Sequence, residues 1–341
     1  MKSPEKSVEV RKVDPSTLAG FRPRYVKCTE SGNITEFVLL AKSPEPFPVK
    51  RISKDYYMIL EGENAGEVFE YEHSEDKSGS IASVRRTLAN LRAIINANCD
   101  DEERLRWVTL TYAENMTDRK RLYEDFKNFH KRFKYWCKKN SVGYPEYIAV
   151  VEPQGRGAWH MHIIWIFPDK APYIENNGVL APIWGHGFTK IKAVHGVDNI
   201  GAYFSAYLAD MPLDEFQRAE NDKSAYTVKY NEVSDDETGE PTKKAFVKGA
   251  RLRLYPSEMN IYRCSRGVRM PVVSKLTQEQ YKEKKANAGT LTFSHACSVV
   301  AVGASGVSGS PSDGGAKTSE ELVLNTISHE YYNKKRRKSQ V

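Results

Sequence analysis

One short run near the middle of the chain restricts the possible fold more than any other segment. His160 and His162 are separated by one apolar residue, and Met161, Ile163 and Trp165 occupy the alternate positions. Side chains alternate between the two faces of a β-strand, so the histidines share one face and the apolar residues point toward a core. The two imidazoles, about 7 Å apart along the strand, can reach a single cation. A chance pair of exposed strand histidines is the alternative, and the run alone leaves it open.

The segments around this run predict an α+β fold with a central antiparallel sheet and flanking helices. Residues 146–152 form a strand, and a turn rich in proline and glycine separates it from the strand at 160–167, which indicates an antiparallel hairpin. A further strand is expected at 105–112. Apolar residues recur at helical spacing in 83–97 and again after Asp118, where they predict a long helix. Mixed helices and strands with antiparallel connections are typical of the α+β class.

Changes in composition along the chain predict three regions. Residues 1–78 are expected to form an N-terminal β-rich extension, because short apolar runs there are interrupted by prolines. Residues 79–275 hold the motifs and are expected to form the main domain, with an exposed acidic insertion at about 211–245. Residues 276–341 are expected to be mostly disordered, because Gly, Ser and Ala dominate 301–315 and leave little to bury.

Charge and cysteine content narrow the classes of function. The 341 residues contain 51 Lys and Arg against 44 Asp and Glu, a formal charge of +7, with basic residues crowded in 85–140 and 243–269. Such a patchy basic surface suits a polyanion, although solvated helix faces explain part of the pattern. The five cysteines are scattered without a Cys-x-x-Cys, which indicates reduced thiols rather than a disulfide framework or zinc site. No apolar run is long enough to cross a membrane and no signal-peptide core is present, so a cytoplasmic location is expected.

A divalent cation at the histidine pair needs a further ligand. Glu152 ends the strand before the hairpin turn, where pairing across the hairpin brings it within reach of His160. Hard cations favour oxygen, and mixed sites usually include a carboxylate. We therefore predict that His160, His162 and Glu152 bind Mg²⁺ or Mn²⁺ and leave positions open for water and substrate. Two alternatives stay open, a solvated strand-end carboxylate at Glu152 and a closed structural metal module.

A pair of tyrosines forms the second candidate for chemistry. Tyr203 and Tyr207 are four residues apart on a predicted helix, so both hydroxyls leave the same face one turn apart. A phenol with a pKa near 10 is a weak nucleophile, but it can attack a phosphodiester when a metal polarises the phosphate and a base accepts the proton. Ordinary packing of two tyrosines is the alternative, since the chain contains 19 of them.

In chain order, three motifs resemble those of the HUH family of rolling-circle replication initiators. The closest class is the two-tyrosine class of single-stranded-DNA phages and related mobile elements. Residues 109–112, Thr-Leu-Thr-Tyr, are similar to the first motif of that family. Residues 159–165 are similar to its histidine motif and 203–207 to its paired tyrosines, so the resemblance covers about 80–270.

The resemblance implies both a fold and an activity. The implied fold is that of HUH endonucleases. The implied activity is metal-dependent nicking and joining of single-stranded DNA at an origin: one tyrosine stays attached to the 5′ phosphate, and the released 3′ hydroxyl primes synthesis. Many members carry a lysine in the third motif, where this chain has Ala206 and Asp210. Lys190 or Lys192 is expected to replace that lysine.

Single-stranded and origin DNA are the expected partners. Guanidinium groups bind phosphates and aromatic faces stack on unpaired bases. The candidates for DNA contact are Arg251, Arg253, Arg263, Arg266, Lys190 and Lys192. The chain has no Gly-x-x-x-x-Gly-Lys-Ser/Thr motif, so a host helicase and a host DNA polymerase are expected partners, in the bacterial cytoplasm if a phage encodes the chain. A relaxase or transposase of the same superfamily and a non-catalytic DNA-binding regulator remain alternatives.

Overall fold

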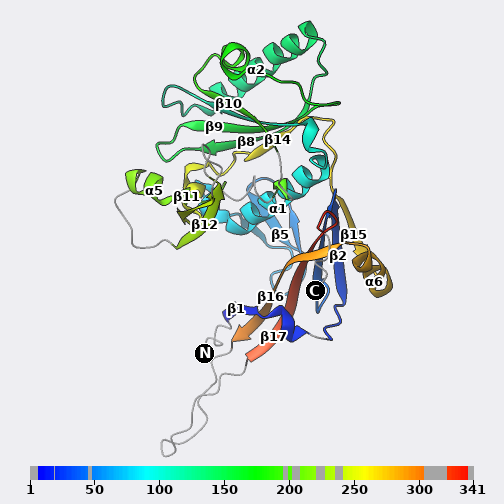
Figure 1. Cartoon of the computed structure of the whole chain (residues 1–341). Helices are drawn as coiled ribbons and strands as arrows, with labels where there is room; N and C mark the ends of the chain where they lie inside the picture. Colours follow the sequence, from blue (N-terminus) through cyan, green and yellow to red (C-terminus); the bar gives the residue numbers. More distant parts are fainter. Residues whose placement is uncertain are drawn as a thin grey trace, which may run out of the picture. The chain divides into compact units, whose positions relative to one another are not determined.

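The chain divides into two compact units (Figure 1). The terminal unit contains both ends of the chain, Met1–Phe69 and Pro271–Val341, and the central unit contains Glu70–Met270. The computed structural model describes residues 7–18, 20–44, 48–194, 199–201, 208–219, 227–234, 241–302 and 321–336. In these residues helices and antiparallel sheets are mixed, which confirms the predicted α+β class. The described residues contain no helix long and apolar enough to span a membrane.

The central unit is built on a five-stranded antiparallel sheet. In spatial order its strands are β10 (Thr189–Ala193), β7 (Leu105–Thr111), β9 (Trp159–Ile166), β8 (Glu146–Pro153) and β14 (Tyr262–Cys264). The hairpin predicted from the sequence is β8–β9, which pairs Glu152 with His160. Its turn contains Gly157 at φ 87°, a left-handed conformation that favours glycine. The alternating run therefore forms a central strand with neighbours on both sides.

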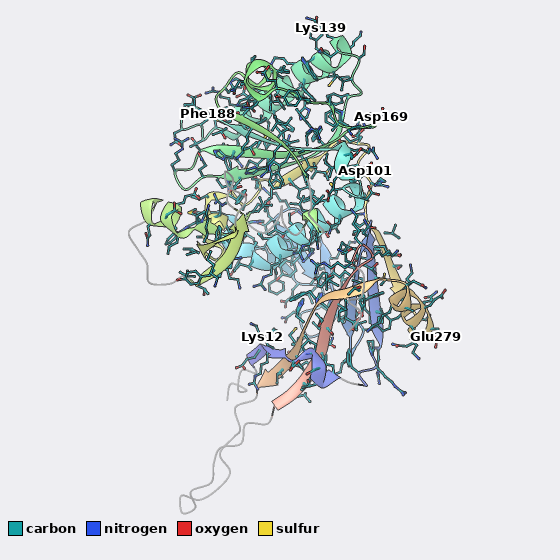
Figure 2. All side chains as sticks on the ribbon, viewed as in Figure 1. Lys12, Asp101, Lys139, Asp169, Phe188 and Glu279 are labelled. Atoms are coloured by element: carbon teal, nitrogen blue, oxygen red, sulfur yellow. The ribbon has the colours of Figure 1, made fainter. Side chains whose placement is uncertain are left out.

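Helices lie on both faces of this sheet, α1 (Ile81–Asn98) on one and α2 (Arg119–Lys139) on the other (Figure 1). The α2 helix begins at Asp118, whose carboxylate accepts the backbone N–H groups of residues 120 and 121. Its apolar stripe packs on β9, where the rings of Phe133 and Trp165 stack with centroids 3.9 Å apart. At its other end Lys139 is exposed (Figure 2). Because Trp165 points toward α2, His160 and His162 point to the opposite face.

Short elements complete this part of the central unit. They are η2 (Lys77–Ser80), η3 (Glu102–Arg104), the π-helical turn η4 (Asn176–Leu180), α3 (Ala181–Trp184) and η5 (Ala250–Leu254).

A second, smaller sheet belongs to the same unit. It contains β11 (Met211–Pro212), β13 (Pro241–Val247) and β12 (Val228–Ser234), and α5 (Leu213–Ala219) follows β11. This region was expected to be an exposed acidic insertion at about 211–245, and the structure corrects that expectation. Met211, Phe216, Val247 and Ala250 form a small buried core of their own. The acidic side chains lie among these apolar residues in sequence, which conceals the core from a composition average.

The terminal unit is a six-stranded antiparallel sheet with a smaller sheet beside it in sequence. In spatial order the large sheet contains β1 (Ser7–Val13), β16 (Thr290–Val302), β17 (Glu321–Asn333), β3 (Ile34–Leu40), β2 (Tyr25–Ser31) and β15 (Val272–Leu276). The other elements are η1 (Pro15–Leu18), α6 (Gln278–Ala286), and the sheet of β4 (Val49–Arg51), β5 (Tyr56–Ile59) and β6 (Val68–Glu70). Tyr281 of α6 packs edge-on against Phe37, with ring centroids 5.1 Å apart.

The terminal unit replaces two of the expected regions. The N-terminal extension expected at 1–78 and the mostly disordered tail expected at 276–341 contribute strands to one sheet, since β16 pairs with β1 and β17 pairs with β3. The Gly- and Ser-rich segment that suggested disorder joins these two long strands, and residues 303–320 lie outside the described part of the chain. The expectation failed because the tail strands bury their residues only against strands from the other end of the chain.

Candidate active site

The β8–β9 hairpin and β7 assemble the candidate site. His160 is paired with Glu152 on β8 and with Thr111 on β7, and His162 is paired with Thr109 on β7. Directly opposite residues of antiparallel strands share a face, so these side chains form one polar group on the face that α2 does not cover. The centroids of the two imidazole rings are 6.3 Å apart.

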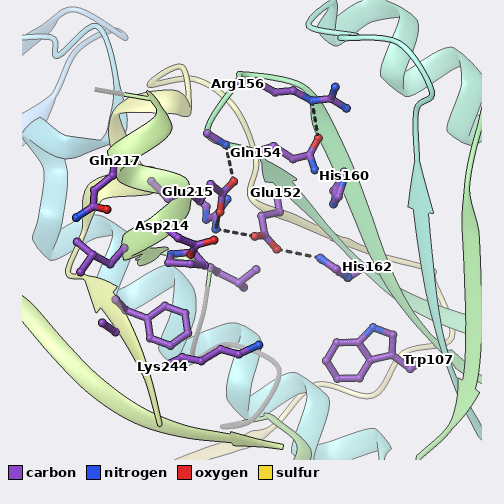
Figure 3. Close-up of a pocket in the computed structure, with 17 residues that line it drawn as sticks. Trp107, Glu152, Gln154, Arg156, His160, His162, Asp214, Glu215, Gln217 and Lys244 are labelled. Carbon is purple, nitrogen blue, oxygen red and sulfur yellow. Dashed lines mark hydrogen bonds and ion pairs between the residues drawn. The ribbon is translucent and has the colours of Figure 1, made fainter. Parts of the chain in front are cut away.

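The two histidines differ in their hydrogen bonds. His162 Nε2 donates to Glu152 Oε2 at 2.9 Å, and its Nδ1 lies 3.2 Å from the hydroxyl of Thr109 (Figure 3). His160 Nε2 is buried and has no hydrogen-bond partner among the described residues. Burial and the neighbouring His162 lower the pKa of His160 to about 4, so its ring is neutral near pH 7. A neutral imidazole is the form that binds a metal ion.

Glu152 is held as a carboxylate by two partners. Burial raises its pKa, but the hydrogen bond from His162 and the charge of Arg251 outweigh burial and lower the pKa to about 2. The Nη2 atom of Arg251 lies 3.1 Å from Glu152 Oε1 and 3.1 Å from Glu215 Oε2 on α5. The guanidinium thus joins α5 to the hairpin below the histidine pair (Figure 3).

Arg251 differs from the role expected for it. It was predicted to contact DNA, but its residue is only 2% exposed. Its remaining donors bind the backbone oxygens of Asp210 at 3.1 Å and Pro153 at 2.5 Å. A guanidinium so enclosed is not available to a phosphate, and its charge instead balances two buried carboxylates.

A cavity of about 1210 Å³ opens over these residues. Glu152, His160 and His162 lie on one side of it, and Trp107 of β7 lines it beside His162 (Figure 3). The opposite wall comes from the second sheet and α5, and includes Leu213, Asp214, Glu215, Lys244 and Phe246. The segment expected to be a solvated insertion therefore forms a wall of the candidate site.

The other predicted DNA contacts lie in different places. Arg263 sits on β14 opposite Ala149, and its guanidinium lies 3.6 Å from the ring centroid of Tyr123 in α2. It is therefore on the face away from the histidines, which contradicts a contact with DNA at this cavity. Arg253 lies 5.3 Å from the ring centroid of Phe216, outside the cavity lining.

The remaining candidates are closer to solvent. Arg266 is exposed in the turn after β14. Lys190 and Lys192 lie on β10, paired with Thr109 and Trp107 of β7, so both lysines share the face of the histidine pair. Lys190 is exposed and Lys192 is half-buried, and their contact with DNA stays a prediction.

The predicted nucleophiles, Tyr203 and Tyr207, lie outside the described residues. The residues on either side of 202–207 are described. Gly201 donates its N–H to Asn96 Oδ1 of α1 at 2.9 Å, and Leu208 is buried and lines the cavity. The segment that carries both tyrosines therefore ends at a residue of the cavity wall, and the role of the tyrosines stays a prediction.

The residues of this site fit a divalent cation only in part. His160 offers a buried neutral ring with a free nitrogen, and Glu152 is ionised. However, no group of three or more His, Cys, Asp or Glu side chains in the described ranges is arranged to hold a metal ion. The oxygens of Glu152 are already bound to His162 and Arg251. Binding of a cation by the predicted ligands requires the His162–Glu152 hydrogen bond to be exchanged for bonds to the ion.

Comparison with known families now adds to this geometry. Residues 105–212 match the family of the replication-associated protein ORF2. The matched segment begins at β7, includes the β8–β9 hairpin, and ends at β11. No curated protein and no solved structure matches the chain. The similarity is consistent with a replication initiator, and the terminal unit lies outside it.

Several residues of the site were not identified from the sequence. Glu215 was counted only as part of an acidic stretch, and Lys244 was not singled out. Trp107 and Thr109 were assigned to a strand without a role in the site. Arg251 stands between two apolar residues, a pattern that hints at burial but does not name the carboxylates that bind it.

Proposed function

We propose that this chain is a replication initiator of the two-tyrosine HUH class, which nicks and rejoins single-stranded DNA at an origin. The match of residues 105–212 to a replication-associated family supports a role in replication. The placement of His160, His162 and Glu152 at one cavity supports phosphodiester chemistry there. The convergence of these three side chains, inside the matched segment, is the observation that carries the proposal.

The ligands of the proposed cation are His160, His162 and Glu152. A bound Mg²⁺ or Mn²⁺ supplies polarisation of a non-bridging oxygen of the scissile phosphate. Thr109 orients His162 through the ring nitrogen that is not a ligand, as partners of metal-binding histidines commonly do. Arg251 keeps Glu152 ionised and in place. Lys190 and Lys192 are placed on the same face to contact phosphates of the bound strand.

The reaction itself is a transesterification by a tyrosine. The phenol oxygen of Tyr203 or Tyr207 attacks phosphorus and forms a bond to the 5′ phosphate, while the bond from phosphorus to the 3′ oxygen breaks. The phenol proton passes to a base, and the departing 3′ oxygen takes up a proton to become a hydroxyl. Attack by a 3′ hydroxyl on the phosphotyrosine reverses both changes and reseals the strand. The described residues that line the cavity include no tyrosine, which leaves this role to the 202–207 segment.

A second tyrosine permits a second cut. While one phenol holds the first 5′ end, the other can cleave the newly made origin at the same site. The released 3′ hydroxyl then serves a host polymerase as a primer, and a host helicase separates the strands.

Covalent capture of DNA tests the proposal. The full chain is incubated with Mn²⁺ and labelled single-stranded oligonucleotides tiled across the replicon that encodes it, and the products are separated on a denaturing gel. We expect one oligonucleotide to give a covalent adduct, and peptide mapping of that adduct to identify Tyr203 or Tyr207. The double variant Tyr203→Phe, Tyr207→Phe is expected to form no adduct while its thermal unfolding is unchanged. An adduct that persists in the double variant removes the tyrosines from the mechanism.

The metal site has a separate test. We expect His160→Ala to lower the rate of nicking at least tenfold and to weaken binding of Mn²⁺ measured by calorimetry in the absence of DNA. Tyr135→Ala, an exposed change on α2, is the matched control and is expected to leave both unchanged. Nicking that continues in chelator at the full rate refutes the metal site. Binding of DNA without any adduct indicates the non-catalytic regulator, and cleavage at a transfer origin or transposon end indicates a relaxase or transposase.

A further inference from the structure

Trp107 is the aromatic side chain of β7 that faces the candidate site. It lines the cavity, and its ring centroid is 6.1 Å from that of His162 in an edge-on arrangement. It is half-buried, since its inner edge packs on the core of the central unit while the rest of the ring faces the cavity (Figure 3). An indole held in this way is a rigid apolar plate beside a polar site.

Cationic side chains surround this plate. The ammonium group of Lys192 on β10 lies 5.3 Å from the centroid of the indole, over its face. Lys190, two residues away on the same strand, projects from the same face of the sheet. Because a lysine side chain is long and flexible, its ammonium can move to a phosphate while the indole receives a flat aromatic group.

The order of these groups across the sheet matches a nucleotide. From β9 to β10, His162, Thr109 and Lys190 form one row, and Trp107 and Lys192 lie two positions along their strands. A strand of DNA whose phosphate lies at the histidine pair thus has an aromatic plate next to it and two cations beyond. Unpaired bases stack on such plates whatever their identity, whereas a paired base does not expose its face.

We propose that Trp107 forms a nucleobase subsite, in which one unpaired base next to the scissile phosphate stacks on the indole and Lys190 and Lys192 bind its flanking phosphates. The subsite would make the site selective for an unpaired strand at one particular nucleotide. This inference rests on the proposed function for the position of the scissile phosphate, but not for the stacking itself.

The test uses a series of oligonucleotides with a single abasic position. The wild-type chain is titrated, in chelator so that no strand is cut, with a fluorescein-labelled single strand and with derivatives that lack the base at one nucleotide in turn. We expect one abasic position to weaken binding about 5- to 150-fold, the range known for loss of a stacked base or its partner. If every abasic strand binds like the intact strand, the subsite does not exist, and this arm needs no variant protein.

Variants then connect that nucleotide to Trp107. Trp107→Leu is expected to weaken binding of the intact strand by the same factor and to bind the critical abasic strand no more weakly, because the lost partners are the same pair. Trp107→Phe is expected to restore most of the affinity, and thermal unfolding confirms that both variants fold. Tyr135→Leu, which removes an exposed aromatic on α2, is the matched control and is expected to bind both strands like the wild type. Equal losses for intact and abasic strands in Trp107→Leu assign the residue a structural role and overturn the proposal.

Nicking measured in parallel separates this inference from the proposed function. Base-dependent binding that requires Trp107 but gives no covalent adduct supports the subsite and refutes the nuclease. An adduct formed equally well by the wild type and by Trp107→Leu, with equal affinity, supports the nuclease and refutes the subsite.

Discussion

Replacement of Arg251 by methionine is the strongest test of how the site is held together. The guanidinium is 2% exposed and lies 3.1 Å from carboxylate oxygens of both Glu152 and Glu215. Methionine has a similar length and keeps most of the packing, but it leaves two buried carboxylates without their cation. Removal of one partner of a buried ion pair typically destabilises a protein by about 3–5 kcal/mol, and we expect a loss in that range.

The central unit offers a selective probe for this measurement. All five tryptophans of the chain, at positions 107, 136, 159, 165 and 184, lie in that unit. Urea unfolding followed by tryptophan fluorescence at pH 7 therefore reports the free energy of unfolding of the central unit. The same loss is expected to shrink near pH 4, where the uncompensated carboxylates of the variant can take up protons.

Two further variants make the result interpretable. The double variant Arg251→Met, Glu215→Gln is expected to recover part of the loss, because one of the stranded charges is removed. Arg266→Met, an exposed arginine of the same region, is expected to change the free energy of unfolding by less than about 0.5 kcal/mol. A loss below about 1 kcal/mol in Arg251→Met refutes the reasoning, since breaking a buried pair on one side leaves an uncompensated charge in the interior.

Two other predictions concern the packing of α2 on the sheet. Burial lowers the pKa of His130 to about 4, whereas an unfolded histidine titrates near 6.5, so the unfolded chain takes up this proton first and stability falls by about 3 kcal/mol as the pH drops from 6.5 to 4. Urea unfolding at several pH values is expected to show this slope in the wild type and a shallower one in His130→Phe, and an identical slope in both counts against it. Phe133→Ala removes a fully buried ring that stacks on Trp165 at 3.9 Å, and it is expected to lower the free energy of unfolding by about 3–5 kcal/mol in the same assay.

Local patterns were sufficient for the central sheet and for part of the site. Alternation identified the strand of His160 and His162, and a short turn fixed the antiparallel neighbour that presents Glu152. The apolar stripe after Asp118 predicted α2, because a helix buries one face at a fixed spacing. Each of these inferences needs only residues that lie within one helix or one hairpin.

Long-range pairing accounts for what the sequence did not reveal. β16 and β17 have acceptable strand sequences, but a composition average over the tail was dominated by the Gly- and Ser-rich segment between them. Arg251 was assigned to DNA because its sequence neighbours include other arginines, and its carboxylate partners at 152 and 215 are far away along the chain. Burial of a charge depends on such distant partners, so one sequence cannot distinguish it from a surface contact.

The closure of the terminal sheet by both ends of the chain has a consequence for biosynthesis. Val10 of β1 is paired with Val299 of β16, so the first strand to leave the ribosome waits for almost the last one before its backbone groups are paired. The central unit has by then been translated completely and can fold on its own during that interval, as domains commonly do. A message cut short after residue 270 would therefore release a chain with a finished central unit and an open β-edge at its N-terminus, an edge prone to aggregation.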